Sequence, residues 1–217
     1  MLPLISAASL LIMPSSSSSP PAPSSLNIYL ARHGQDQDNA ASILNGHRNQ
    51  PLTSIGIRQA STVAEKIRSA GLTFDAIYSS PLQRAHQTAL IIASEGQCLG
   101  SECRNRKSAC DSESAVQVMD QLIERDFGIM TGVPAKEIRS RCSGPGELLL
   151  TDTISYFLKP EGAETFPDLI ERANGVIEDI RQQHEGRDES VLLPTAPIHL
   201  CPHAAALYLR SHHWPVR

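Results

Sequence analysis

Residues Leu26 to Gly34 read LNIYLARHG, an apolar run that is followed at once by Arg32, His33 and Gly34. The β-branched and aromatic members of this run are typical of a buried β-strand. In parallel sheets, ligands bind beyond the carboxyl ends of the strands. This stretch therefore predicts a buried strand that delivers an arginine and a histidine to a ligand-binding edge.

The next segment predicts a repeated unit of helix and strand. Thr53 or Ser54 can cap a helix whose apolar residues recur three and four apart as far as Ile67. Phe74 to Ser79 (FDAIYS) is typical of a second strand, and Ser80-Pro81 offers a cap and a first-turn proline to another helix. This order predicts an α/β fold, a three-layer sandwich with a mostly parallel central sheet flanked by helices.

The later part of the chain continues this pattern with interruptions. The polar stretch from Gly96 to Ser114 predicts an inserted loop, and Ala115 to Ile123 can hold a short strand. Asp168 to Arg181 has its apolar residues on one face and predicts an amphipathic helix. Two apolar runs remain, Val191 to Leu193 and Ile198 to Cys201, and either fits the last strand.

The composition limits the classes of protein to consider. Hydrophobic residues make up 41% of the 217 residues, which excludes a wholly disordered chain. The net charge of −4 argues against a nucleic-acid partner. Pro14 to Ser25 contains only Ser, Pro and Ala, which bury little surface. We therefore expect a disordered Ser/Pro-rich leader over residues 1–25 and one domain over residues 26–217.

The leader and the cysteines bear on the compartment. Met1 to Met13 is apolar but shorter than the roughly 20 residues of a membrane span, and it lacks the basic start of a signal peptide. The five cysteines are odd in number and irregularly spaced, which argues against a disulfide framework. We expect a cytoplasmic protein with no membrane partner, and an N-terminal targeting signal remains an alternative.

Four motifs occur in order between Asn27 and Arg172. They are LARHGQDQDNAASILNGHRNQPLTSIGIRQA at residues 30–60, YSSPLQRAHQTA at 78–89, LIERDFGIMTG at 122–132 and PEGAET at 160–165. Together they resemble the histidine phosphatase superfamily, which contains cofactor-dependent phosphoglycerate mutases and fructose-2,6-bisphosphatases. The last motif is similar to that family's P-x-G-E-(S/T) segment, with Ala163 inserted or slipped. The resemblance implies the phosphoglycerate mutase-like version of the sandwich fold.

The resemblance also implies roles for individual residues. His33 would attack the substrate phosphorus and become a phosphohistidine, and Glu124 would give a proton to the leaving alcohol. Arg32 and Arg84 would hold the phosphate oxygens, since a guanidinium matches them geometrically. The other residues expected to bind substrate are Asn39, Asn45 and Gly46. We expect no metal and no cofactor, because arginines and histidines supply the positive charge.

The C-terminal part departs from the family pattern. The family's second catalytic histidine precedes a glycine at the end of a late strand, and no His-Gly pair follows Gly34. His203, in IHLCPHAAAL, is the expected counterpart; His199 and loss of the histidine are the alternatives. Few residues follow His203, so we expect the C-terminal end to be truncated or altered. The pair His212-His213 fits a polar terminus better than a metal site.

The expected function is hydrolysis of a phosphomonoester through a phosphohistidine. The substrate would be a small phosphorylated metabolite, a sugar phosphate or bisphosphate. The segment from Phe127 to Pro134 lacks the basic mutase pattern, which favours a phosphatase over a phosphoglycerate mutase. Two alternatives stay open: a mutase, and a catalytically impaired member with a binding or regulatory role. The sequence leaves the oligomeric state open.

Overall fold

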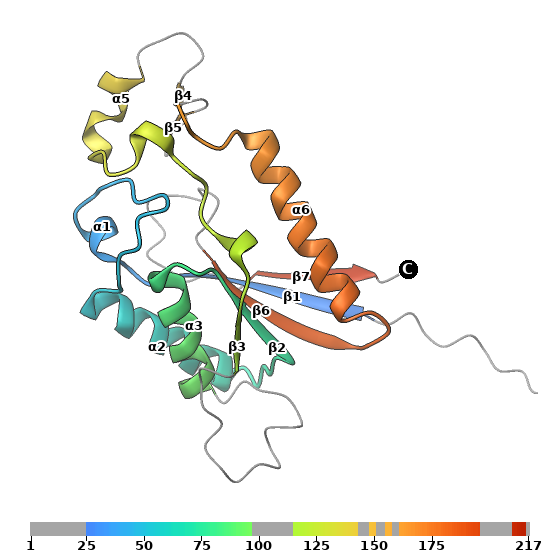
Figure 1. Ribbon diagram of the computed structural model, residues 1–217. Coiled ribbons are helices and arrows are strands. Elements are labelled where there is room, and N and C mark those ends of the chain that lie inside the picture. Colours follow the sequence, from blue (N-terminus) through green and yellow to red (C-terminus); the bar gives the residue numbers. More distant parts are fainter. Residues whose placement is uncertain are drawn as a thin grey trace, which may run out of the picture.

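The central feature of the computed structural model is a five-stranded sheet in the order β3-β2-β6-β1-β7 (Figure 1). The structure describes residues 25–96, 115–142, 148–150, 155–157, 161–195 and 210–215. The first four strands of that order are parallel, and β7 pairs antiparallel with β1. The predicted mostly parallel sheet is confirmed. The strands are β1 (Ser25–Arg32), β2 (Ala76–Ser79), β3 (Val116–Val118), β6 (Glu189–Thr195) and β7 (Arg210–Pro215).

Both faces of this sheet are buried along its central strands β1, β2 and β6, which explains the runs of apolar residues in these strands. Along β6, Val191 and Leu193 pack into one core cluster while Leu192 packs into the other. Ile77 in β2 faces the same side as Leu192, and Tyr78 faces the opposite side. Successive side chains in a strand point to opposite faces, so strands covered on both sides carry continuous rather than alternating apolar residues.

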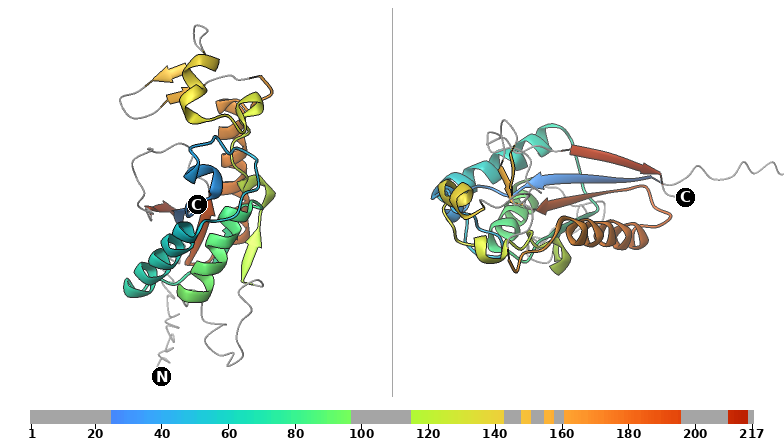
Figure 2. Two further views of the ribbon diagram at one scale, coloured as in Figure 1. Left: turned by 90° about the vertical axis from the view of Figure 1, so that its left-hand side faces the viewer. Right: turned by 90° about the horizontal axis from the view of Figure 1, so that it is seen from above.

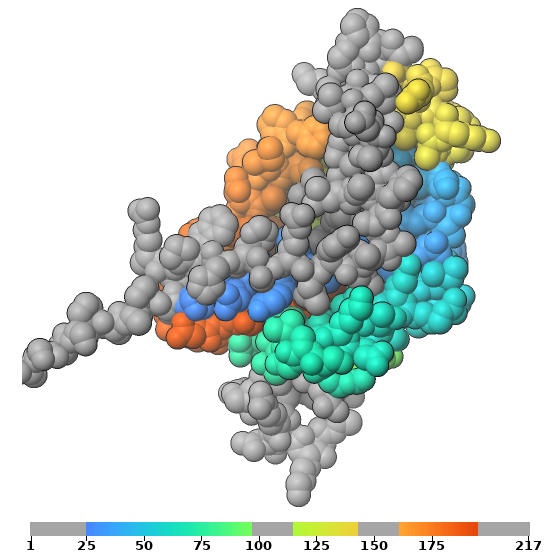
Figure 3. Space-filling view, turned by 180° about the vertical axis from the view of Figure 1, so that it is seen from behind, coloured from blue at the N-terminus to red at the C-terminus, as the bar shows by residue number. Residues whose placement is uncertain are grey.

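Helices cover the two faces and complete the three layers. Helices α2 (Ser54–Ser69) and α3 (Gln83–Gly96) pack on one face, and α6 (Phe166–Gln183) packs on the other. Figure 2, seen from above, has α6 along one side of the strands and α2 along the other. Figure 3 shows the same layers from behind, with β1 and β6 between α6 and α2. The predicted sandwich is therefore confirmed.

Shorter elements complete the described chain. They are α1 (Gln37–Ala40), α5 (Ile138–Arg141), the 3-10 helices η1 (Asp120–Leu122), η2 (Gly128–Met130) and η3 (Ala135–Glu137), and the hairpin of β4 (Leu148–Leu150) and β5 (Ser155–Phe157). A third core cluster joins Phe127, Met130 and Val133 to Ile138, with Leu44 packed against it. This cluster fixes the segment around Phe127 beside the loop that follows α1. No helix within the described ranges is long and apolar enough to span a membrane.

The helix starts test the capping predictions. Thr53 caps α2 as expected, because its hydroxyl accepts a hydrogen bond from the Gly56 N–H at 3.1 Å. The predicted start of α3 at Ser80-Pro81 is wrong, since the helix begins at Gln83. The Gln83 N–H donates to the side chain of Asn49 at 2.7 Å. A loop distant in sequence thus supplies the acceptor that sets this helix start.

The structure shows which of the two late apolar runs forms a strand, and it adds the strand β7. Of the two apolar runs, Val191 to Leu193 lies in β6, between β1 and β2. The other run, like residues 97–114 of the predicted loop, lies outside the described residues. His212 and His213 lie in β7, opposite Ile28 and Asn27, a strand that the sequence did not predict. A short strand at Val116–Val118 is confirmed.

Candidate active site

The parallel strands bring the predicted arginines and histidine to one edge of the sheet. Arg32 is the last residue of β1, and His33 follows directly. Arg84 lies in the first turn of α3, just after β2 ends at Ser79. The positive charges of Arg84 and Arg32 both act on the His33 imidazole. The edge predicted from the strand order thus gathers three residues from two strand ends.

Gly34 holds this edge against α2 by close backbone contact. A Cβ at Gly34 would lie 2.3 Å from the carbonyl oxygen of Gly56, and a Cβ at Gly56 would lie 2.1 Å from that of Gln35. The Gly34 N–H also donates to the Thr88 hydroxyl at 3.1 Å. The close contact that requires a glycine at this position is the contact with the start of α2.

His33 is buried and set up as a neutral imidazole. Its Nδ1 lies 2.6 Å from the carbonyl oxygen of Gly34. A carbonyl can only accept, so Nδ1 carries the proton and Nε2 carries the lone pair. Burial, together with the charges of Arg84 and Arg32, lowers the pKa of His33 to about 3. His33 is therefore an uncharged nitrogen base at every pH of ordinary interest.

Arg84 is fully buried, and its guanidinium is fixed by the loop after α1. Its Nη1 donates to the carbonyl of Arg48 at 2.8 Å and its Nη2 donates to the carbonyl of Gly46 at 2.9 Å. Its Nε lies 3.4 Å from the Asp36 carboxylate. A guanidinium has five N–H groups in one plane, so these contacts leave further donors in a defined orientation.

Asp36 organises the loop and was not predicted from the sequence. It is fully buried, caps α1 by accepting from the Asn39 N–H at 2.7 Å, and accepts from the Asn45 side-chain amide at 2.7 Å. Burial raises the pKa of Asp36, and Arg84 opposes that rise. An acidic residue just before a helical turn is a cap signal, but its pairing with an arginine far along the chain is not readable.

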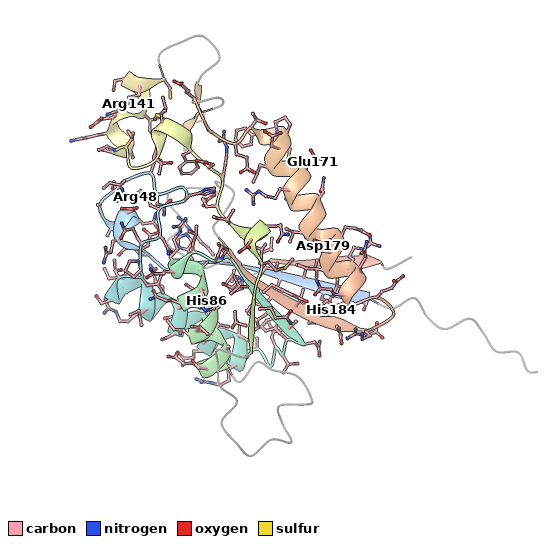
Figure 4. All side chains as sticks on the ribbon, in the orientation of Figure 1. Arg48, His86, Arg141, Glu171, Asp179 and His184 are labelled. Carbon is pink, nitrogen blue, oxygen red and sulfur yellow. The ribbon has the colours of Figure 1, made fainter. Side chains whose placement is uncertain are left out.

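The predicted substrate-binding residues in this loop therefore have partners within the protein. The Asn45 amide contacts Asp36, and the Gly46 carbonyl contacts Arg84. Asn39 contacts Asp36 through its backbone N–H. Arg48, marked in Figure 4 beside α1, binds Asp38 through two hydrogen bonds. These contacts fix the loop that holds Arg84.

Glu124 lies in the segment between η1 and η2, and its charge interacts with those of Arg32 and Arg84. Its carboxylate accepts a hydrogen bond from the Arg125 N–H at 2.8 Å, and its backbone carbonyl accepts from His47 Nε2 at 2.7 Å. Burial raises the pKa of Glu124 to about 7, against the charges of Arg84, Arg172 and Arg32. Burial is the largest cause of this rise in pKa.

The structure does not describe the predicted second histidine. β6 ends at Thr195, which pairs with Arg32, so the chain leaves the sheet beside the cluster just described. His203 and its alternative His199 lie outside the described residues.

The fold and the site together define an α/β protein in which the charges of two arginines act on a buried histidine and on a protonatable carboxyl group. Residues 28–207 match the histidine phosphatase superfamily (branch 1), and the chain belongs to this superfamily.

Curated relatives support the same assignment. A probable phosphoglycerate mutase of Proteus mirabilis is 48% identical over 73 residues, which cover 34% of this chain and 33% of the relative. A 2,3-bisphosphoglycerate-dependent phosphoglycerate mutase of a Methylobacterium species is 30% identical over 145 residues, 67% of this chain and 62% of the relative. The chain thus spans less than two thirds of the length of these relatives.

Solved structures share the fold at low sequence identity. A mycobacterial glucosyl-3-phosphoglycerate phosphatase in complex with VO3 superposes with a TM-score of 0.57 at 23% identity, covering 78% of this chain and 75% of that one. A phosphoglycerate mutase from Bacillus anthracis gives a TM-score of 0.59 at 17% identity, covering 80% and 76%. At this identity the likeness establishes the fold.

Proposed function

We propose that this chain hydrolyses phosphomonoesters through a phosphohistidine at His33. The observation that carries the proposal is the neutral, oriented imidazole of His33 under the charges of Arg84 and Arg32, with the protonatable Glu124 acting on the same arginines. An uncharged nitrogen with an available lone pair is a nucleophile, and guanidinium groups stabilise the charge that spreads over phosphate oxygens.

The reaction proceeds in two steps. First, His33 Nε2 forms a bond to phosphorus as the bond from phosphorus to the ester oxygen breaks, and Glu124 gives its proton to that oxygen. Second, a water attacks the phosphohistidine, Glu124 takes a proton from the water, and the bond from phosphorus to nitrogen breaks to release phosphate. The Nδ1–H bond to Gly34 stabilises the positive imidazole ring that forms in between.

The other predicted residues support these steps. Arg32 and Arg84 bind the phosphate oxygens. Asn39, Asn45 and Gly46 hold the adjoining loop in position against Arg84 through their hydrogen bonds. We propose His203 as a further donor to the phosphate. Support for this placement is the end of β6 at Thr195, beside Arg32.

The proposed substrate is a small phosphorylated metabolite, such as a sugar phosphate or bisphosphate. Solved proteins of this fold include a phosphatase named for glucosyl-3-phosphoglycerate and a putative phosphatase named for α-ribazole-5′-phosphate. A second candidate, a phosphoglycerate mutase, is favoured by the names of the curated relatives. A cytoplasmic location is proposed from the cysteine pattern and from Cys142, a buried free thiol.

Purified protein is expected to release p-nitrophenol from p-nitrophenyl phosphate without added metal. Rapid acid-free denaturation during turnover is expected to trap an acid-labile phosphoryl group on the peptide that contains His33. A parallel assay with 3-phosphoglycerate and 2,3-bisphosphoglycerate tests the mutase. Isomerisation faster than phosphate release would favour the mutase, and absence of turnover and label would leave the impaired, regulatory member.

Glu124→Gln is expected to remove the part of the rate that depends on proton donation to the leaving oxygen. For phenyl phosphate, kcat/KM should fall by roughly 10²-fold at pH 6, because Gln has no proton to give. The wild-type rate should decline as the pH rises through about 7, where Glu124 loses its proton, and the variant should lack that decline. Both proteins see the same ionisation of the substrate, so their ratio isolates Glu124.

The matched control is Glu171→Gln, on the exposed side of α6 (Figure 4). It should leave both the rate and the pH profile unchanged. A Glu124→Gln variant that keeps the wild-type decline above pH 7 would refute the role of Glu124 as proton donor.

A further inference from the structure

The segment that carries Glu124 is held from α6 by one arginine. Arg172 Nη1 donates to the backbone carbonyl of Gln121 at 2.6 Å and to that of Ile123 at 2.8 Å. These two carbonyls belong to the residues just before Glu124. The N-terminal half of α6 thereby contacts the chain around η1 (Figure 1). Both N–H groups of Arg172 Nη1 therefore donate hydrogen bonds to the backbone segment that carries the Glu124 side chain.

Arg172 is itself fixed by a carboxylate. Glu164 receives two parallel hydrogen bonds from it, at 2.8 Å from Nε and 2.7 Å from Nη2, and the two side chains are only 22% and 16% exposed. A bidentate pair of this kind gives geometric specificity as well as energy. Four of the five N–H groups of Arg172 therefore have defined partners, and the side chain has one orientation.

Glu164 also meets the Glu124 segment by its own backbone. Its N–H donates to the carbonyl of Asp126 at 3.1 Å, and its carbonyl accepts from Arg125 Nε at 2.9 Å. On the far side of the segment, His47 donates to the Glu124 carbonyl. The carboxylate thus sits on a short stretch of backbone that is held before, at and after Glu124.

We propose that Arg172, oriented by Glu164, is the positioning residue that holds Glu124 in place for proton transfer. The inference rests on the proposed function, because it assigns Arg172 a share of that reaction. Arg172 is not a catalytic residue, since its partners are backbone carbonyls and Glu164 rather than reacting atoms. The charge of Arg172 also acts on Glu124 and lowers its pKa, in opposition to burial.

The test is the dependence of kcat/KM on the leaving group. Phenyl phosphate needs a proton on its leaving oxygen far more than p-nitrophenyl phosphate does. Arg172→Gln is expected to lose about 10- to 50-fold with phenyl phosphate and less than about threefold with p-nitrophenyl phosphate, because a displaced acid fails only where its proton is needed. A general loss of structure would lower both rates equally.

The matched control lies on the same helix. Arg181→Gln removes an arginine that pairs with Glu178 three residues away, and it should lower neither rate. Glu164→Gln, which loosens Arg172 without removing it, should shift the ratio in the same direction by a smaller factor. If Arg172→Gln and Glu164→Gln both leave the ratio of the two rates at the wild-type value, the proposal is wrong.

Hydrogen exchange separates this proposal from the proposed function. Amides in residues 119–126 should exchange about tenfold faster in Arg172→Gln than in wild type or Arg181→Gln, because the segment loses its link to α6. If the wild type neither turns over substrate nor carries label on His33, the hydrolase proposal fails. The comparison of exchange rates still shows whether Arg172 holds residues 119–126. Equal exchange rates in wild type, Arg172→Gln and Arg181→Gln would overturn the proposal.

Discussion

His33→Gln is expected to abolish turnover of p-nitrophenyl phosphate, with kcat/KM lower by at least about 10³-fold. Glutamine keeps much of the volume of histidine but has no nitrogen lone pair that can accept the phosphoryl group. The remaining arginines would still bind phosphate, so inorganic phosphate should protect the variant against thermal unfolding as it protects the wild type. The measurements are steady-state rates, trapped phosphoryl label and melting temperature.

Stability should change little in this variant. His33 is neutral in the fold, because its pKa is lowered to about 3, and it is replaced by another neutral side chain. A suitable control is His86→Gln on α3 (Figure 4), which should keep full activity. Residual turnover near the wild-type level in His33→Gln, or label on another residue, would show that the nucleophile lies elsewhere.

Arg84→Met is expected to be the most destabilising of the substitutions considered, by about 3–5 kcal/mol. Methionine fills part of the volume but leaves the Asp36 carboxylate buried without its cation. It also leaves the carbonyls of Gly46 and Arg48 without their donor. Urea denaturation at pH 7.5 measures the loss, and Arg58→Met on the exposed side of α2 should cost less than about 0.5 kcal/mol.

The pH dependence of this loss has a definite sign. Burial already raises the pKa of Asp36, and removing Arg84 takes away a charge that opposes the rise. A carboxyl whose pKa is raised in the fold binds protons more readily there than in the unfolded chain, so the folded state gains stability as the pH falls. The loss of unfolding free energy caused by Arg84→Met should therefore be smaller at pH 5 than at pH 7.5.

A double variant separates stability from catalysis. Asp36→Asn combined with Arg84→Met removes the isolated charge and should recover part of the stability, since paired groups are not additive. Activity is expected to be absent in both variants, because the arginine that we propose to bind phosphate is missing. Restored turnover in the double variant would mean that Arg84 acts only through the fold.

The first half of the fold could be predicted because its signals are local. The cap at Thr53, the apolar helix faces and the continuous apolar strands each follow from neighbouring residues. The start of α3 could not be predicted, because its acceptor is Asn49, 34 residues away. The strand β7 was missed since its sequence, RSHHWP, has none of the continuous apolar character of the buried strands.

Some residues of the site could be predicted from the sequence, and others could not. His33, Arg32, Arg84 and Glu124 stand in sequence motifs, and the structure gathers all four. The roles of Asp36 and Arg172 could not be predicted, because each depends on a partner that only the fold brings close. Asp36 forms an ion pair with Arg84 in α3, and Arg172 in α6 donates a hydrogen bond to the carbonyl of Gln121. In the PEGAET motif, Glu164 is the glutamate that pairs with Arg172.

The place of β6 in the sheet has a consequence for how the protein is made. β6 lies between β1 and β2, and it pairs Leu26 with Glu189 across most of the chain. During synthesis β1 and β2 therefore have no shared neighbour until residue 195 has left the ribosome. Contacts this distant in sequence slow folding and leave strand edges exposed to other chains. Arg32 ends β1 and Arg84 follows β2, so the pairing of both strands with β6 is what brings these two arginines to the same edge of the sheet.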